Sequence, residues 1–191
     1  MSVWRSDRSP DAPLLAAVVY PNEAYPQATF RRIVAHCRSR ALRLAGVLQH
    51  PACEDPAHRC DVVLEDLASG ERTELFERRG SGAQGCRLDV AALTDVTARI
   101  ERVLQHDPAL LVLNKFGKVE AEGGGLVDPI AMAIDRGIPV IIGVPARNLP
   151  AWRGFAGDLA VEFTGDFGAI ADWLDLVCNE RIASAPLLKA S

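Results

Sequence analysis

The stretch LLVLNKFGKVEAEGGGL, residues 110–126, brings together residue types that could bind a small anion. A continuous apolar run ends there, and two lysines, two glutamates and three consecutive glycines follow it. Lysines supply charged donors, and glycine-rich backbone ahead of a helix can present N–H groups to a negative charge. We therefore predict an anion or nucleotide-fragment site formed by Asn114, Lys115, Gly117, Lys118, Glu120, Glu122, Gly123, Gly124 and Gly125. The alternative is a flexible loop whose charged side chains are only solvated.

Two nucleotide-binding motifs fit this sequence poorly. Guanine-binding loops read Asn-Lys-x-Asp, and here Gly117 stands where the aspartate would follow Asn114 and Lys115. A phosphate-binding P-loop needs glycines and a lysine between the first strand and its helix. Residues 20–30, YPNEAYPQATF, contain neither, and Glu23 would repel a triphosphate. We therefore predict no catalytic residues of the standard P-loop type, and Asn114 could equally be the plain end of a strand.

A second group of chemically capable residues lies in HPACEDPAHRC, residues 50–60. Its four nitrogen and sulfur ligands are of the kind that zinc prefers, namely His50, Cys53, His58 and Cys60. Their H-x₂-C-x₄-H-x-C spacing is not a standard zinc pattern, and two prolines make the segment irregular. We interpret it as a surface loop, with a metal site as the weaker alternative.

Length and composition limit the function classes. A chain of 191 residues with 49% hydrophobic and 24% charged residues is typical of one globular domain. The formal charge of −4 argues against a broad nucleic-acid surface. We expect no membrane span and no secretory signal, because no apolar run is long enough and none precedes Leu14. Five scattered cysteines then favour reduced thiols in the cytoplasm.

Hydrophobic periodicity predicts the elements that position these residues. Short apolar runs predict buried strands at 14–20, 42–49, 109–114 and 138–144. Apolar stripes at helical spacing predict helices over 26–40, after Asp89, from Asp128 to Gly137, at 148–156 and around 170–177. Asp89 and Asp128 are expected to cap their helices. Residues 60–77 alternate around Ser69-Gly70 and predict a hairpin, and residues 158–163 predict an edge strand.

Buried strands that alternate with helices predict an α/β fold with a mostly parallel, doubly wound sheet and an inserted hairpin. We expect a single domain over 14–180, a disordered lead-in at 1–13 and a tail at 181–191. Ligands of such sheets bind beyond the carboxyl ends of the strands. Residues 114–125 follow one of those ends.

Residues 111–160 also resemble a family of uncharacterised proteins that are often encoded beside molybdate-transport and nitrogenase genes. The resemblance rests on N-K-F-G-K-x-E-A-E-G at 114–123, on GCRLDVAAL at 85–93 and on the hairpin residues 64–71. It covers about residues 14–165. Gln49 matches the family pattern at the end of the second strand, and Cys86 and Arg87 lie in the matching G-C-R-L-D stretch. Cys86 is either a small buried residue or a thiol that faces the ligand loop, with its pKa lowered by Arg87.

That family is in turn similar to the cancer-related nucleoside-triphosphatases, which have a P-loop fold. In those enzymes a strand ending in D-E-I-G-K-M-E occupies the place of residues 113–120. The resemblance implies that Asn114 and Lys115 replace a magnesium-binding carboxylate pair, while Gly117, Lys118 and Glu120 are retained. An amide and a cation cannot hold Mg²⁺ as two carboxylates do. The resemblance therefore implies a P-loop-like fold with degenerate Walker motifs.

Three hypotheses follow from the sequence. The first is a non-hydrolytic binding protein for molybdenum handling, which takes molybdate, another oxyanion or a cofactor fragment at residues 114–125. Arg87 and Gln49 join the candidate ligands in that case, and a molybdate-transport or nitrogenase-related protein is the expected partner. The second is a nucleoside-triphosphatase or phosphotransferase with an atypical phosphate loop. The third is a dimeric protein-interaction module without a small ligand.

Overall fold

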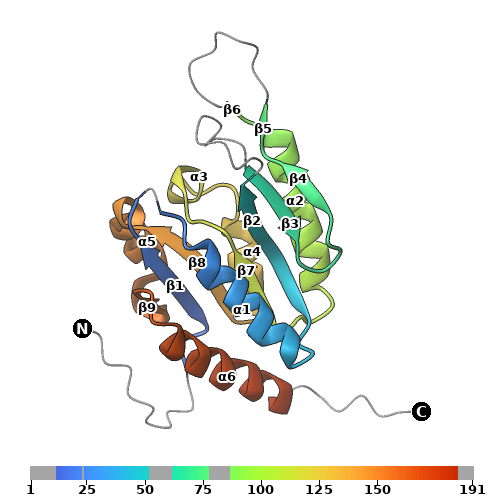
Figure 1. The fold of residues 1–191 in the computed structure, drawn as a ribbon, viewed down its shortest axis with the longest axis vertical. Helices are drawn as coiled ribbons and strands as arrows, with labels where there is room; N and C mark the ends of the chain where they lie inside the picture. The colour runs from blue at the N-terminus through green and yellow to red at the C-terminus, as the bar shows by residue number, and fades with distance from the viewer. Residues whose placement is uncertain (1–11, 23, 52–61, 78–86, 185–191) are drawn as a thin grey trace.

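The computed structural model describes residues 12–22, 24–51, 62–77 and 87–184. Its centre is a seven-stranded sheet in the order β4-β3-β2-β7-β8-β1-β9 (Figure 1). The five strands from β2 to β9 in this order are parallel, and they are β2 (Leu44–Pro51), β7 (Leu110–Leu113), β8 (Val140–Pro145), β1 (Leu15–Tyr20) and β9 (Ala160–Phe163). The predicted α/β fold with a mostly parallel sheet is confirmed.

Helices cover both faces of this sheet, as the amphipathic stripes predict. One face packs against α1 (Gln27–Ser39) and α6 (Phe167–Ser184) through a core that includes Phe30 and Trp173. The other packs against α2 (Val90–Leu104), α4 (Val127–Asp135) and α5 (Leu149–Ala156) through a core that includes Ile100, Ile130 and Trp152. Figure 1 shows α1 and α6 in front of the sheet and α2 and α4 behind it. Strands β7 and β8 are buried throughout, which explains their unbroken apolar sequence.

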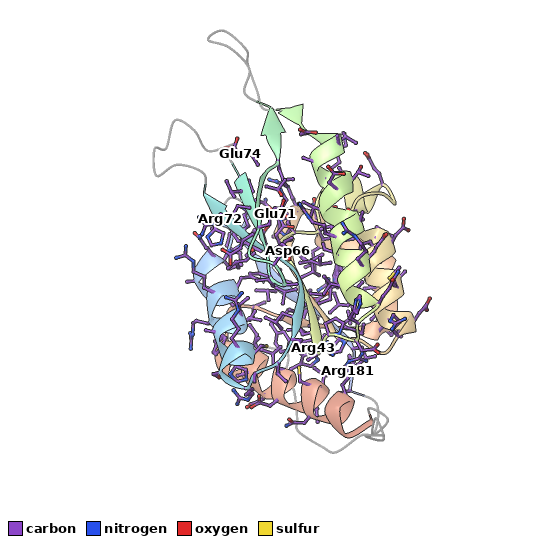
Figure 2. The ribbon with its side chains drawn as sticks, turned by 90° about the vertical axis from the view of Figure 1, so that its right-hand side faces the viewer. Arg43, Asp66, Glu71, Arg72, Glu74 and Arg181 are labelled. Atoms are coloured by element: carbon purple, nitrogen blue, oxygen red, sulfur yellow. The ribbon has the colours of Figure 1, made fainter. Side chains whose placement is uncertain are left out.

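The predicted hairpin extends the sheet as two antiparallel strands, β3 (Val62–Asp66) and β4 (Arg72–Glu74). Asp66 organises its turn, because one carboxylate oxygen accepts hydrogen bonds from the backbone N–H groups of Ala68 and Ser69 at 2.9 and 2.7 Å. Figure 2 labels Asp66 together with three charged, exposed residues of the hairpin, which are Glu71, Arg72 and Glu74. A separate two-stranded ribbon, β5 (Phe76–Glu77) with β6 (Arg87–Leu88), was not predicted.

Three boundaries differ from the prediction. Helix α4 begins at Val127 with Leu126 as its N-cap, so the predicted cap at Asp128 is wrong and Asp128 lies in the first turn. Residues Lys118–Ala121 form a short helix, α3, inside the segment predicted as a loop. Helix α6 continues to Ser184, past the predicted domain end at 180. The cap of α2 is as predicted, since Asp89 accepts a hydrogen bond from the Ala92 backbone N–H at 2.9 Å.

At the end of the sheet away from α3, arginine side chains form hydrogen bonds with the segment before β7. Arg43 and Arg181, which lie close together in Figure 2, donate to the backbone carbonyls of Asp107 and Pro108 at 3.2 and 3.0 Å. Arg136 donates to the Asp107 carboxylate at 2.9 Å and lowers the pKa of that group. The cations at this end therefore hold the chain together. Among the described residues, no helix is long and apolar enough to cross a membrane.

Candidate functional site

A pocket of about 300 Å³ opens at the carboxyl ends of β1, β2 and β7. Helix α3 and the hairpin strand β3 supply further lining residues, and Figure 1 shows α3 at this end of the sheet. Six of the predicted ligand residues line it: Gln49, Asn114, Lys115, Gly117, Lys118 and Glu120. They meet because parallel strands end at one edge of a sheet, so the residues that follow each strand become neighbours.

Asn114 and Gln49 join two neighbouring strands at the floor of this pocket. Asn114 directly follows β7 and is 8% exposed, and its side-chain amide donates to the Gln49 side-chain oxygen at 3.2 Å. Gly143 on β8 makes room for this turn, because a Cβ at Gly143 would lie 2.5 Å from the Asn114 carbonyl oxygen. The chain therefore leaves β7 in a fixed direction and carries Lys115 into the pocket.

Lys115 is a half-buried cation of the pocket wall that lacks a counter-charge within hydrogen-bond or ion-pair distance among the described residues. Burial lowers the pKa of its ammonium group, and the charge of Arg147 lowers it further, while Glu120 opposes the shift. Arg147 is held at this edge because its backbone N–H donates to the Asn22 side chain at 2.6 Å. Two positive charges thus lie near each other with incomplete compensation, which favours an anion.

Glu120 is not free to serve a ligand in this structure. It is 7% exposed, and its two carboxylate oxygens accept hydrogen bonds from the backbone N–H groups of Gly117 at 2.8 Å and Leu126 at 3.3 Å. The first contact caps α3, and the second ties the loop after α3 back to it. The carboxylate therefore fixes the shape of the 114–126 segment.

The three glycines, predicted to face an anion, instead close the chain around Glu120. The backbone N–H groups of Gly123 and Gly124 donate to the carbonyls of Glu120 and Val119 at 3.0 and 2.9 Å. Gly125 has a φ of +60°, and a Cβ there would collide with the Glu120 carboxylate. None of the three glycines lines the pocket. Glu122 also lies outside it, with its carboxylate 3.7 Å from the ammonium of Lys118 on the exposed face of α3.

The place of a phosphate loop is taken by aromatic side chains. Tyr20 and Tyr25 pack edge to face with ring centroids 5.8 Å apart, and Tyr25 stacks on Phe30 at 5.4 Å. Burial raises the pKa of Tyr20 to about 12 and also raises that of Tyr25. The Tyr25 hydroxyl is buried beside the Gln49 backbone without a well-formed hydrogen bond. Both tyrosines line the pocket, and neither was predicted as a site residue.

Magnesium, on which P-loop hydrolases depend, does not fit the residues at this pocket. Mg²⁺ is held by carboxylates together with phosphate oxygens and water. Glu120 is the one carboxylate among the described residues that line the pocket, and both of its oxygens already accept backbone hydrogen bonds. Asn114 and Lys115 hold the position after β7 at which the resemblance placed the magnesium carboxylates.

The other predicted candidates lie away from the pocket or outside the described residues. His50, on β2, lies 2.9 Å from the Glu65 carboxylate without hydrogen-bond geometry. The other three residues of the metal hypothesis, Cys53, His58 and Cys60, lie outside the described residues, as does Cys86. Only the backbone of Arg87, in β6, is described. Cys37 and Cys178 are buried free thiols, and burial raises their pKa values to about 11 and about 12.

Comparison with solved structures agrees with this fold. The chain is similar to THEP1 from the hyperthermophile Aquifex aeolicus, with a TM-score of 0.59 and 13% sequence identity. The similarity covers 84% of this chain and 98% of THEP1. The chain therefore has the P-loop NTPase fold, although the loop after its first strand lacks glycine and lysine.

Among curated proteins, the chain is 34% identical over 131 residues to the molybdenum import ATP-binding protein ModC 2 of Bradyrhizobium diazoefficiens. The match takes in 69% of this chain and 15% of the length of that relative. The family of proteins of unknown function DUF2478 matches residues 15–173, so this chain belongs to the DUF2478 family.

Proposed function

We propose that this protein binds an anionic ligand in the pocket at the ends of β1, β2 and β7, and that it does not cleave phosphate bonds. The observation that carries the proposal is the ammonium group of Lys115, which lines the pocket half-buried, within electrostatic range of Arg147 and without an ion-pair partner among the described residues. A bound anion would supply the missing counter-charge, and a charge-assisted hydrogen bond of this kind is strong. Asn114 and Gln49 would orient the ligand.

The biological setting that we propose is molybdenum handling in the cytoplasm. The relative named for molybdenum import supports this setting. The matched stretch is 15% of that protein, so this chain corresponds to one part of a longer chain. The ligand would be molybdate, a related oxyanion or a fragment of a molybdenum-containing cofactor. A molybdate-transport or nitrogenase-related protein is the proposed partner, and a homodimer is compatible with this role.

Substitution of Lys115 by methionine tests the binding site. We expect Lys115→Met to weaken anion binding by roughly 10- to 150-fold, the loss of about 1.5–3 kcal/mol from one hydrogen bond to a charged group. Thermal unfolding and calorimetric titration with molybdate, tungstate, sulfate and phosphate measure this effect. At about 100 times its dissociation constant, a ligand adds roughly 2.7 kcal/mol to the free energy of unfolding.

Lys118→Met is the matched control, since the Lys118 side chain is 86% exposed and faces Glu122 on the rim. It should weaken binding by less than about threefold, as expected for a screened surface charge. Equal losses in the two variants, or no stabilisation of the wild type by any of the four anions, would contradict the proposal.

Without a ligand, Lys115→Met should not lower the free energy of unfolding, because burial of the Lys115 ammonium group carries a desolvation penalty in the folded protein. Its pKa is lower in the folded than in the unfolded chain, so below both values the penalty lowers the free energy of unfolding. As the pH rises from the folded pKa toward 10.5, the unfolded chain holds more protons and the wild type regains stability. We expect Lys115→Met to be no less stable than wild type at pH 7 and to lack this gain. Urea unfolding between pH 7 and pH 10 measures the difference.

A nucleoside-triphosphatase is the second candidate, and the P-loop NTPase fold favours it. It requires turnover of ATP or GTP that depends on Mg²⁺ and disappears in Lys115→Ala. Tyr20 and Tyr25 in the place of a phosphate loop, and the engaged carboxylate of Glu120, argue against it. We therefore expect no turnover above a buffer control.

A further inference from the structure

The pocket has two walls of different chemistry. One is polar and carries Lys115, Asn114 and Gln49 at the strand ends. The other is aliphatic and is built from the hairpin, the segment after it and α2. Its lining residues Leu64 and Leu75 are buried in the core, whereas Val62 and Leu93 are partly exposed. Leu93 is only partly buried against the core, so part of its side chain is available to a ligand. A ligand that fills the pocket must therefore satisfy both walls.

A bare tetrahedral oxyanion satisfies only one of them. Its oxygens are acceptors in every direction, and contact with Val62 and Leu93 would remove water from these oxygens without replacing its hydrogen bonds. The volume leads to the same conclusion. The pocket measures about 300 Å³, which is at the lower end of sites for organic ligands, roughly 300–1,000 Å³, whereas one water occupies about 30 Å³.

The two tyrosines that line the pocket add a requirement of their own. The Tyr25 hydroxyl is buried at the pocket without a well-formed hydrogen bond, so it is a donor that lacks a good acceptor. Tyr20 lines the same pocket and packs edge to face with Tyr25. An aromatic ring packs well against leucine and tyrosine side chains, and a polar atom on that ring could accept from Tyr25.

We infer that the ligand is an organic anion, in which a flat, largely apolar ring lies against Val62 and Leu93 and a phosphate or similar group reaches Lys115. The inference rests on the proposed anion site and narrows its ligand class. An inorganic oxyanion alone would then be the weaker ligand, held by the polar wall only.

A series with one anionic group and a growing apolar part tests this inference: inorganic phosphate, methyl phosphate and phenyl phosphate, titrated into the full chain by calorimetry at pH 8. We expect phenyl phosphate to bind at least tenfold more tightly than inorganic phosphate, with methyl phosphate close to inorganic phosphate. Equal affinities for phenyl and inorganic phosphate would overturn the inference and leave the anion site intact. If none of the three binds at concentrations up to about 10 mM, the anion site is overturned as well.

A variant separates the ring from the anion. Leu93→Asn should abolish the advantage of phenyl phosphate and preserve the affinity for inorganic phosphate, because Leu93 belongs to the aliphatic lining of the pocket and Lys115 to the polar lining. Lys115→Met should weaken all three ligands together. If Leu93→Asn retains the full tenfold preference, the ring does not lie on this wall and the inference is wrong. The wild-type series decides the question independently should the variant fail to fold.

Discussion

Replacing Glu120 by alanine is expected to lower the free energy of unfolding by about 2–4 kcal/mol and to abolish anion binding. The carboxylate is 7% exposed and accepts hydrogen bonds from the backbone N–H groups of Gly117 and Leu126. Alanine would leave both donors without an acceptor, and each unsatisfied buried donor costs about 1–3 kcal/mol. The loop that carries Lys115 would then lose the contact that fixes its shape. Chemical unfolding and calorimetric titration measure the two effects.

Glu122→Ala is the matched control for this substitution, because it removes an exposed glutamate two residues away. Its carboxylate lies 3.7 Å from Lys118 with 66% of the side chain exposed. We expect a change in the free energy of unfolding within about 0.5 kcal/mol. Glu120→Gln keeps one acceptor and should fall between the two alanine variants. If Glu120→Ala unfolds at the same urea concentration as Glu122→Ala, the conclusion that Glu120 fixes the shape of the 114–126 segment is wrong.

Gly46→Ala is expected to cost about 4 kcal/mol or more and to prevent accumulation of folded protein at 37 °C. Gly46 lies in the middle of β2 with a φ of +101°, which an L-residue rarely adopts. A Cβ there would also collide with the backbone carbonyl of Val112 on β7, which cannot move without breaking the sheet. Loss of this pairing would separate Gln49 from Asn114, so the pocket floor would be lost with the fold.

Gly154→Ala provides the contrast within the same chain. Gly154 lies inside α5, and a Cβ there has no neighbour within 4 Å. Alanine should therefore stabilise the helix by about 0.5–1 kcal/mol. Circular dichroism during thermal unfolding distinguishes the two glycine variants. A folded Gly46→Ala protein with the wild-type melting temperature would contradict the register of β2 on β7.

The parts of the fold that the sequence predicts are those in which one local pattern decides the structure. The apolar runs of β1, β7 and β8 are buried on both faces, so nothing else in the chain competes with their pattern. Helix α3 has four residues and is capped by the side chain of Glu120, so it is too short for hydrophobic periodicity to predict it. Helix α4 begins before its aspartate because the backbone N–H of Val127 already bonds to Gly124 at 3.3 Å.

The residues of the site also fall into those that the sequence predicts and those that it does not. Gln49, Asn114 and Lys115 meet because each of them lies at or just after the end of a parallel strand, which is a property of the fold class. Glu120 and the glycines fit an anion loop by residue type. Only the three-dimensional contacts reveal that the Glu120 carboxylate accepts backbone hydrogen bonds within the segment and that Gly123 and Gly124 bond to the carbonyls of α3. Tyr25 and Arg147 were missed, although they lie in the segments that directly follow the strands β1 and β8. Loops at the same sheet edge were the signal that could have found them.

The state of the Lys115 ammonium group tests the account most directly. The chain contains three lysines, at 115, 118 and 189, so NMR of protein labelled with ¹³C and ¹⁵N in lysine follows three side chains, and Lys115→Arg assigns the signal of Lys115. We predict that Lys115 in the folded protein titrates below the same group in the urea-unfolded chain, and that saturation with phenyl phosphate raises its pKa. A Lys115 that titrates alike in the folded and unfolded chains, and that does not respond to the anion, would contradict the account.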